Sequence, residues 1–345
     1  MEHNKFWEQN QAETMRDALS IILIVHVHEP RGHKNKEQLQ CSGTERFSIE
    51  EFNEIYQGIV GAGYFVQAIY FNEIEFINDY TEHPNRFINC LVYSLARNGI
   101  GTNKKTIIPS FCELVGLRYT TSPSLSCALA RNKYYFSVLL NTHNIPVPKS
   151  WLYSENGTWI NSCPPIGTKV ICKPCFESAS QGINESKIIT YSDKHCYELL
   201  QTSHIVQEYI GGAECEVPII KNGNDIHVFP PVGIDLHGKR ILDEETSEHY
   251  HYDFYTLDKV FSSKTVDKIK NYAERAFQLL QMEVYGRIDF RINRNEEPFI
   301  IDISTTPYTT KHSSFAFAFE LLGFEYFDVY RAIISAAMMR QQKLN

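Results

Sequence analysis

Residues 285–304 read YGRIDFRINRNEEPFIIDIS. Apolar and polar residues alternate over 284–292, and β-rich apolar residues return over 298–303, which is typical of two β-strands. The polar segment between them, residues 293–297, is short enough to make the two strands neighbours. Short strands separated by turn residues also precede this pair, which favours antiparallel sheets in the second half of the chain.

Four polar side chains of this strand pair form a candidate site. Successive side chains of a strand point to opposite faces, so Arg287 and Asp289 share one face. On the next strand Asp302 and Ser304 share a face in the same way. Two carboxylates could thus converge, and carboxylate oxygens are what a Mg²⁺ ion carrying nucleotide phosphates requires. On the pattern alone, the ordinary exposed face of a strand pair remains an alternative.

The N-terminal third of the chain predicts alternating strands and helices. Its expected strands are the apolar, β-rich segments 18–27, 64–71 and 87–95. Between the first two, residues 48–60 predict a helix, because Ser48 with Glu51 three residues later forms a capping-box signature. This order of elements is typical of a doubly wound parallel sheet.

The middle of the chain has a different pattern. A helix is expected over 133–142, and the segment NIPVP, residues 144–148, ends it. Short strands are expected at residues 168–173, 187–190, 204–210 and 214–220, and further strands continue through residues 228–236. Two further helices are expected at 192–200 and, strongly amphipathic, at 265–282.

A lysine and a loop of small residues form a second candidate site. Lys173 ends an expected strand, and the small, polar segment 177–182, ESASQG, follows it. Backbone N–H groups in such a loop can approach a phosphate closely, and the lysine adds a positive charge. The segment is not a Walker A motif, because its lysine precedes the loop. A plain turn is the alternative.

Composition narrows the class of protein. A chain of 345 residues that is 43% hydrophobic predicts an enzyme of two or three lobes. With a net charge of -8 and no basic block, no nucleic-acid partner is expected. No membrane span is expected either, because no apolar run reaches about 18 residues. Nine scattered cysteines and no apolar leader predict reduced thiols in the cytoplasm. The one C-x-x-C, at Cys172 and Cys175, lacks the second pair that a zinc site needs.

In their order and spacing, the loop and the carboxylates resemble the ATP-grasp superfamily, and within it D-alanine–D-alanine ligase. The most specific stretch, residues 285–319, resembles the family's G-R-x-D, a turn, E-x-N-x-x-P-G-M-T and a later serine. The resemblance implies an α/β protein with the ATP-grasp fold. It implies an N-terminal preATP-grasp, Rossmann-like domain over 1–125, a small central lobe over 126–211, and a C-terminal lobe with the metal and substrate site over 212–345.

The resemblance implies five catalytic residues. Arg287 matches the arginine that stabilises the tetrahedral intermediate, and the backbone N–H of Tyr308 is expected to face the same oxyanion. Ser313 matches the serine that holds the second substrate's carboxylate. Glu45, in TERFS, matches the glutamate near the first substrate's amino group. Ser180 lies in SASQG, which resembles the family's G-S-S-x-G loop.

The resemblance also implies a nucleotide site and a metal site. The ATP-binding residues that it implies are Lys133, Lys173, Ser178, Gln207, Glu208, Tyr209, Glu214 and Ile301. The implied metal ligands are Asp289, Asp302 and Ser304, with ATP and Mg²⁺ or Mn²⁺ as cofactors. Taken singly, each match also fits an ordinary helix, strand or loop residue, whereas their shared order favours the site.

The implied activity is that of an ATP-dependent carboxylate–amine ligase, class EC 6.3 and most like 6.3.2. Such an enzyme forms an amide or peptide bond through an acyl phosphate. Small amino acids or amines are the expected substrates, and family analogy favours a homodimer. A non-catalytic or weakly active ATP-binding homologue with a regulatory role is the alternative, and a kinase acting on an alcohol is a third hypothesis.

The chain departs from the family pattern around the acceptor and the second metal. Asp302 stands where the family usually has glutamate, and Ser304 where it has asparagine. Residues 307–310, PYTT, replace P-G-M-T. Residues 242–253 correspond to the family's mobile loop, which often carries a lysine, and they contain none. These departures predict substrates other than two D-alanines.

Four histidines have no assigned role on this pattern. They are His26, His28, His249 and His251. The first two alternate at a strand end, where either a zinc site or a substrate contact is open. The last two lie in the mobile loop, as ligands or as solvated residues.

Overall fold

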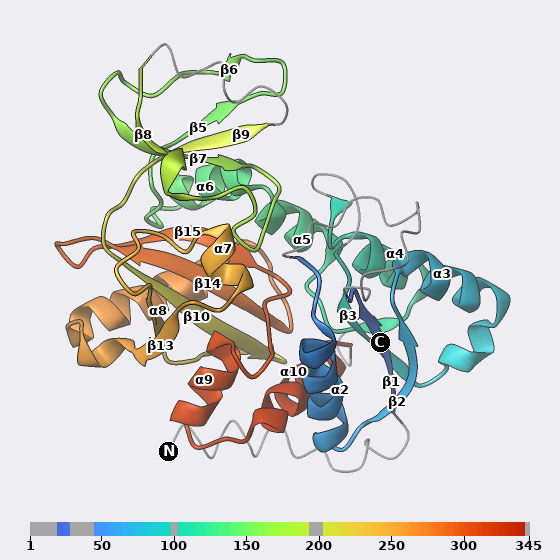
Figure 1. The fold of residues 1–345 in the computed structure, drawn as a ribbon. Helices are drawn as coiled ribbons and strands as arrows, with labels where there is room; N and C mark the ends of the chain where they lie inside the picture. Colours follow the sequence, from blue (N-terminus) through green and yellow to red (C-terminus); the bar gives the residue numbers. More distant parts are fainter. Residues whose placement is uncertain (1–18, 28–44, 98–102, 193–202, 342–345) are drawn as a thin grey trace.

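The computed structural model describes residues 19–27, 45–97, 103–192 and 203–341, so the helix expected at 192–200 lies outside it except for its first residue. The described part of the chain contains three β-sheets, with helices packed around them (Figure 1). In Figure 1 the N-terminal sheet, blue to cyan, lies beside the C-terminal sheet, and the green middle sheet lies above the latter.

The N-terminal sheet is parallel, with the strand order β2-β1-β3-β4. Its strands are β1 (Ser20–Val25), β2 (Phe65–Tyr70), β3 (Cys90–Leu95) and β4 (Arg118–Tyr119). Ile21 and Leu23 of β1 join one hydrophobic core. Ile22 and Ile24 join another on the opposite face. Burial on both faces confirms the doubly wound arrangement that the sequence predicts.

The helices of this part are α2 (Ile49–Gly61), α3 (Glu73–Glu82) and α4 (Ile107–Val115). The predicted capping box of α2 is present: the Ser48 hydroxyl accepts from the Glu51 N–H at 3.1 Å, and the Ser48 N–H donates to the Glu51 carboxylate at 2.7 Å. The strand expected from residue 87 begins later, because η3 (Pro84–Phe87) is a 3₁₀ turn.

The middle sheet is antiparallel, with the order β6-β5-β9-β7-β8. Its elements are β5 (Ser150–Tyr153), β6 (Trp159–Ile160), β7 (Lys169–Pro174), η5 (Glu185–Lys187), β8 (Ile188–Thr190) and β9 (His204–Glu208). Two helices lead into it, α5 (Ser124–Arg131) and α6 (Lys133–Thr142). The domain boundary expected at residue 125 falls inside α5, so the division into three domains stays a prediction.

The C-terminal sheet is antiparallel, with the order β13-β12-β10-β14-β15 and β11 paired to β10. Its strands are β10 (Ala213–Asn222), β11 (Asp225–Val228), β12 (Val232–Asp235), β13 (Asp253–Thr256), β14 (Tyr285–Ile292) and β15 (Pro298–Ser304). The strands expected through residues 228–236 are β11, which ends at Val228, and β12, and Pro230 and Pro231 lie between them. Proline has no N–H to donate to a strand ladder.

The remaining helices are α7 (Glu244–Glu248), η7 (Leu257–Lys259), α8 (Ser263–Leu279), α9 (Ser314–Leu321) and α10 (Tyr326–Gln341). α8 is the long amphipathic helix that the sequence predicts, and its apolar side packs into the core of the C-terminal sheet. α10 packs against both α2 and β10. Within the described ranges, no helix has the length and apolar character needed to cross a membrane.

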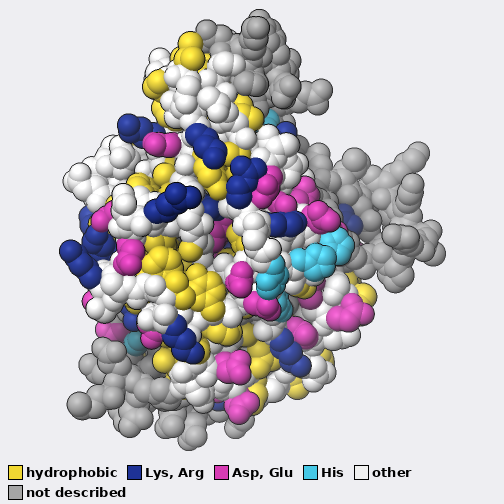
Figure 2. All heavy atoms as spheres, turned by 60° about the vertical axis from the view of Figure 1, so that its left-hand side comes forward, with side chains coloured by type: hydrophobic (Ala, Val, Ile, Leu, Met, Phe, Trp, Pro, Cys, Tyr) yellow, Lys and Arg dark blue, Asp and Glu magenta, His cyan; other side chains and the backbone are white. Residues whose placement is uncertain are grey.

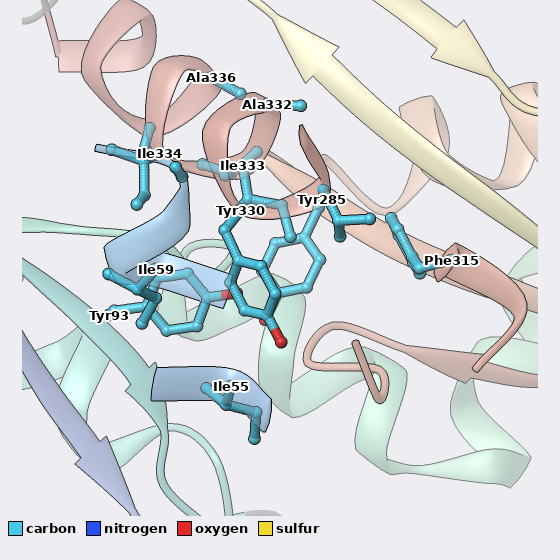
Figure 3. Close-up of a cluster of buried hydrophobic side chains, with 14 of the residues drawn as sticks. Ile55, Ile59, Tyr93, Tyr285, Phe315, Tyr330, Ala332, Ile333, Ile334 and Ala336 are labelled. Atoms are coloured by element: carbon cyan, nitrogen blue, oxygen red, sulfur yellow. The ribbon is translucent and has the colours of Figure 1, made fainter. Parts of the chain in front are cut away.

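One core joins the N-terminal sheet to the C-terminal sheet. Tyr330 of α10 lies between Tyr93 of β3 and Tyr285 of β14 (Figure 3). The Tyr93 and Tyr330 rings are 6.0 Å apart, and Phe315 packs edge-on against Tyr285 at 5.9 Å. Because these rings are fully buried, the core fixes how the two sheets face each other.

Candidate active site

A large cavity, about 470 Å³, opens between the middle and C-terminal sheets and reaches the N-terminal part. Its walls hold the side chains that the sequence singles out, with one exception. They are Lys133, Lys173, Ser178, Ser180, Gln207, Glu208, Tyr209, Glu214, Arg287, Asp289, Ile301, Asp302, Ser304, Tyr308 and Ser313. The exception, Glu45, is completely buried. Their position in one cavity is a structural finding, whereas their individual roles remain predictions.

The carboxylates converge through strand register. Asp289 of β14 pairs directly with Asp302 of β15, and Arg287 pairs with Ser304. On the other side of β14, Asp289 pairs with Glu216 of β10. A row of three acids therefore crosses three adjacent strands. The sequence analysis missed Glu216, although its alternation with Glu214 along β10 is the signal that would have found it.

Each predicted metal ligand with a carboxylate is paired with a cation. Arg287 donates from Nε and Nη2 to the two oxygens of Asp289 at 2.7 and 2.8 Å. The same guanidinium lies 3.1 Å from Glu216. Lys133 Nζ donates to Asp302 at 2.8 Å. A bidentate pair of this kind fixes the guanidinium in one orientation.

The electrostatics of the two aspartates differ. Burial, with the negative charges of Glu216 and Asp302, raises the pKa of Asp289 despite its pairing with Arg287. Burial acts on Asp302 in the same direction, but the positive charges of Lys133 and Lys173 leave its pKa below the ordinary value. An excess of negative charge around Asp289 is the environment in which a divalent cation is stabilised.

The residues present fit one divalent ion. Asp289 and Asp302 lie opposite each other, with Ser304 next on the same strand face. Among the described residues, no three His, Cys, Asp or Glu side chains converge as an all-protein metal site would need. Two carboxylates suit Mg²⁺, which usually completes its shell with waters and substrate phosphates.

Two lysines enter the cavity from different elements. Lys173 ends β7, and Lys133 begins α6. The Lys133 N–H donates to the Cys175 carbonyl at 3.1 Å, which places the start of α6 beside the end of β7. Burial and the nearby Lys133 lower the pKa of Lys173 to about 8. Two buried ammonium groups so close together favour a polyanion between them.

The loop that follows Lys173 has an unusual backbone. Ala179 and Ser180 both take left-handed φ values, 53° and 54°. Within the described chain, no group accepts from the N–H of either residue. The Ser180 hydroxyl donates to the Leu242 carbonyl at 2.9 Å, and the Gly182 N–H donates to Glu244 at 3.0 Å. The loop is therefore held against α7, with backbone donors left for an anion.

Four of the residues predicted to bind ATP lie where β9 ends and β10 begins: Gln207, Glu208, Tyr209 and Glu214. Tyr209 is flanked by two cations, with Lys169 Nζ 5.0 Å and the Arg291 guanidinium 5.4 Å from its ring centre. Glu214 forms an ion pair with Arg291 and accepts from the Leu242 N–H at 3.2 Å. The sequence analysis missed Arg291, which stands two residues beyond Asp289 on the same strand face.

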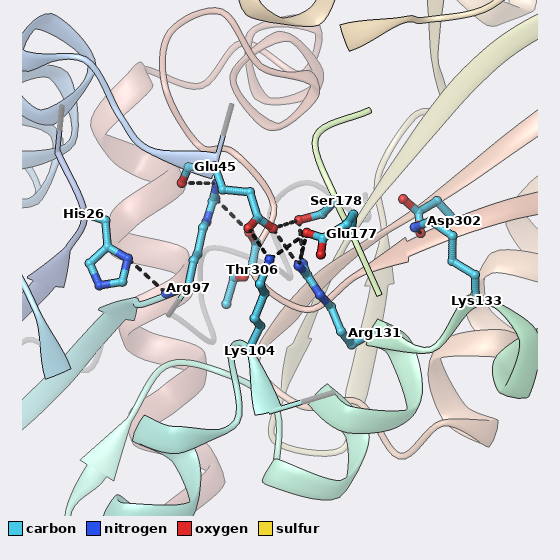
Figure 4. A network of polar contacts seen from close by, with 10 residues as sticks. All are labelled: His26, Glu45, Arg97, Lys104, Arg131, Lys133, Glu177, Ser178, Asp302 and Thr306. Carbon is cyan, nitrogen blue, oxygen red and sulfur yellow. Dashed lines mark hydrogen bonds and ion pairs between the residues drawn. The ribbon is translucent and has the colours of Figure 1, made fainter. Parts of the chain in front are cut away.

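The environment of Glu45 differs from the one expected. Its carboxylate accepts from Arg131 Nη2 at 2.8 Å, from Lys104 Nζ at 3.3 Å and from the Ser178 hydroxyl (Figure 4). Burial alone would raise the pKa of Glu45, but Arg131, Lys104, Lys105 and Ser178 lower it to about 2. Glu45 is thus a fixed anion inside the wall and not a carboxylate lining the cavity.

A family model described as D-ala D-ala ligase C-terminus matches residues 145–335. This chain belongs to that family. The match covers the middle and C-terminal sheets, and therefore the strands that carry the lysine, the loop and the carboxylates.

Similar proteins agree with this membership of the D-ala D-ala ligase family. A D-alanine–D-alanine ligase of Bordetella pertussis is 28% identical over 230 residues, which cover 65% of this chain and 72% of that protein. An uncharacterised protein of Sinorhizobium fredii, y4sG, is 25% identical over 257 residues, 72% of this chain and 75% of its own length.

Solved structures confirm the predicted α/β class and ATP-grasp fold. The D-alanine–D-alanine ligase from Bacillus anthracis in complex with ATP has a TM-score of 0.68 at 16% identity, covering 95% of this chain and all of that chain. The enzyme from Coxiella burnetii has a TM-score of 0.66 at 16% identity, covering 94% and 96%. At this identity the likeness concerns the fold.

Ser313 and Tyr308, two predicted catalytic residues of this D-ala D-ala ligase family member, have structural contacts of their own. Ser313 is the N-cap of α9, accepting from the Ala316 N–H at 3.2 Å and donating to the Thr310 carbonyl at 2.6 Å. The ring of Tyr308 packs 5.1 Å from that of Phe47. A capping role for Ser313 does not exclude substrate contact, since the residue also lines the cavity.

The histidines fall into two environments. His26 is buried, 3.1 Å from Glu73, and accepts from the Arg97 N–H at 3.3 Å, so it connects elements behind the cavity. His28 lies outside the described residues. His249 and His251 stack at 5.5 Å in the segment after α7, and histidines gather beside acidic side chains on the face shown in Figure 2. The C-x-x-C thiols are free and buried, and burial raises the pKa of Cys175 to about 12.

Proposed function

We propose that this protein is an ATP-dependent carboxylate–amine ligase that forms an amide or peptide bond through an acyl phosphate. One observation carries the proposal. Two buried lysines, a loop of unused N–H groups and a facing pair of aspartates share one cavity with Arg287. Such a set neutralises and positions a transferring phosphoryl group next to a carboxylate.

The first step needs positioning more than chemistry by the protein. An oxygen of the acid's carboxylate attacks the γ-phosphorus of ATP, the bond to the β,γ-bridging oxygen breaks, and ADP leaves. Lys133 and Lys173 would neutralise the charge on the phosphates, and the N–H groups of Ala179 and Ser180 would hold them in place. The products of this step are ADP and an acyl phosphate.

In the second step the amine attacks the acyl carbon, and inorganic phosphate leaves with the bonding electron pair. Arg287 would stabilise the oxyanion. Its Nε and Nη2 bind acids, while within the described chain nothing accepts from Nη1. The amine's proton leaves with phosphate or solvent. A guanidinium oriented in advance in a buried site stabilises developing charge effectively.

A divalent ion bound by Asp289 and Asp302, with Ser304 nearby, would supply charge neutralisation to the phosphates. Ser304 and the shorter Asp302 distinguish this site from the family pattern. With Tyr308 on the acceptor side, these residues support a second part of the proposal, that the substrates are not two D-alanines.

The non-catalytic alternative is not favoured. Lys133, Lys173, Arg287 and Asp289 all line the cavity. The cavity that they line has a volume of about 470 Å³, which leaves a position for phosphates. A binding protein has no need for an arginine held by two carboxylates beside that position.

Release of ADP by the purified full-length chain tests the proposal. The protein is incubated with ATP, Mg²⁺, and pairs of acids and amines, and ADP and the new amide are both quantified. We expect ADP and amide in equal amounts with at least one pair and little with two D-alanines. Turnover with D-alanine alone at the rate of a cell-wall enzyme would contradict the different-substrate part. ADP without amide would instead indicate a kinase.

A further inference from the structure

The N-terminal side of the cavity is rich in basic side chains that the proposed reaction does not use. Arg97, Lys105 and Arg131 line it, and Lys104 lies directly behind. Lys104 and Arg131 are both shared between Glu45 and Glu177, at distances of 2.6 to 3.5 Å. Two acids thus match two of these bases, and Figure 4 shows the four side chains pointing at one another.

Arg97 is held in this wall by its surroundings. Its guanidinium donates to the backbone carbonyls of Glu45 and Thr306 at 3.3 and 3.4 Å. It also stacks 4.7 Å from the ring centre of Phe47 and 4.6 Å from that of Tyr308. These contacts fix the position of the guanidinium beside the cavity.

Lys105 is the least compensated of the basic residues. Its side chain is only 8% exposed, yet among the described residues no carboxylate lies within ion-pair distance. Its backbone takes φ = 67°, in the left-handed region that a lysine adopts at a cost. Burial, with the charges of Arg97 and Arg131, lowers its pKa well below the ordinary value. Strain and a buried unpaired charge at one residue are typical of a ligand-binding position.

The phosphates of ATP have other partners. Lys133 and Lys173 approach from α6 and β7, and the loop N–H groups lie with them. The basic wall comes instead from the segments before α4 and at the end of α5, on the N-terminal side. Glu45 is already bound by two cations, so it is not available to a substrate ammonium.

We propose that Lys105, flanked by Arg97 and Arg131, binds a second anionic group on the acid substrate. The acid is therefore a dianion, such as a dicarboxylate, with one carboxylate activated beside Arg287 and the other held by the basic wall. This inference rests on the proposed ligase function, since it names the class of acid that the same cavity takes.

Matched acids test the proposal by binding. Glutarate, butyrate and 4-aminobutyrate share a carboxylate and a three-methylene spacing and differ in carrying a second carboxylate, no charge or an ammonium at the far end. Succinate, propionate and β-alanine form the same series one carbon shorter. Each is titrated calorimetrically into the full chain with Mg²⁺ and β,γ-methylene ATP. We expect the diacid to bind at least tenfold more tightly than its two partners in one series or both.

Two variants assign the effect to the residue. Lys105→Met is expected to lose that tenfold preference while still binding β,γ-methylene ATP, and Lys105→Arg to keep part of it. Lys259→Met, at an exposed lysine of η7, is the control and should bind the acids as the unsubstituted chain does. Lys105→Met should also fold, because it removes a buried, uncompensated charge.

The outcomes separate the two claims. Equal affinity within both series, including no binding at all, overturns the dianion proposal, and so does a preference that survives in Lys105→Met. Release of ADP with an amine added tests the ligase function separately. A diacid that binds through Lys105 without ADP release from any acid–amine pair would leave the binding site in place and remove the ligase function.

Discussion

At the scale of single residues, the site is a set of charges whose partners decide what each can do. Arg287 is held by two acids, which orients it, whereas Glu45 is held by two cations, which isolates it from the cavity. Both are buried, so each depends on its partners to remain charged. Substitutions at these two residues therefore test different properties, catalysis and pH-dependent stability.

Arg287→Lys keeps the positive charge and removes the planar fork that binds Asp289. We expect ligation to fall by about a hundredfold, because a lysine cannot hold the bidentate geometry that presents a donor to the oxyanion. ATP affinity should change little, since the lysines and the loop are the proposed contacts of the phosphates. Steady-state kinetics of ADP release measures both. Arg294→Lys, on the exposed turn after β14, is the matched control and should be unaffected.

Glu45→Gln should change how stability depends on pH. The folded pKa of Glu45 is about 2, below its ordinary value of 4.5, so its ionisation stabilises the fold above pH 4.5 and this contribution is lost as pH falls toward 2. The linked free energy is about 3 kcal/mol.

Urea unfolding between pH 7 and 3.5 provides the measurement. The unsubstituted chain should lose stability faster than Glu45→Gln as pH falls below about 5, so the gap between them narrows. If the stabilities of the two proteins fall in parallel with pH, the surroundings of Glu45 do not lower its pKa as described.

At the scale of elements, the placement of the site depends on how α10 fits against α2. Gly58 of α2 faces the ring of Tyr330, and a Cβ there would lie 2.1 Å from a ring carbon. The ring is completely buried among aromatic neighbours and cannot withdraw without moving them. The helix contact thus requires glycine for space and not for backbone conformation.

Gly58→Ala should therefore destabilise the protein by about 1–3 kcal/mol, because overpacking outweighs the gain of up to about 1 kcal/mol that alanine brings to a helix. Denaturant unfolding measures the change. Val60→Ala, on the exposed side of the same helix, should lie within about 0.5 kcal/mol of the unsubstituted chain. A neutral Gly58→Ala would mean that α10 packs less closely than described.

At the scale of the whole molecule, ATP would bind between two sheets that share few contacts of their own. The loop after β7 reaches the C-terminal part through Leu242 and Glu244. A nucleotide held by Lys173 on one side and Asp302 on the other would add contacts across this junction. Ligand binding of this kind stabilises the folded state by mass action.

ATP with Mg²⁺ should therefore raise the melting temperature by an amount that grows with ATP concentration. At an ATP concentration a hundredfold above Kd, the free energy of unfolding should rise by about 2.7 kcal/mol. Lys173→Met should lose most of this shift, while Lys187→Met, at an exposed lysine near β8, should keep it. Differential scanning calorimetry measures both. A full shift in Lys173→Met would show that this lysine does not bind the phosphates.

Much of the fold could be predicted from local patterns. The capping box at Ser48, the bounds of α6, and the strand pair carrying Arg287 and Asp289 all depend on residues a few positions apart. Side-chain alternation then places Asp289 and, on the neighbouring strand, Asp302 on one face. Local patterns were less exact at the ends of elements: the strand expected from residue 87 begins at Cys90, after the 3₁₀ turn η3.

The sequence by itself determined the ATP-grasp fold and which side chains surround the cavity, because strand alternation and motif order are properties of neighbouring residues. Only the tertiary structure decided that Glu45 is clamped inside the wall, that Glu216 continues the row of acids, and that Lys105 faces the cavity. These facts depend on contacts between segments that are far apart in the chain. Burial and unpaired charge arise only when such segments meet, so no local pattern contains them.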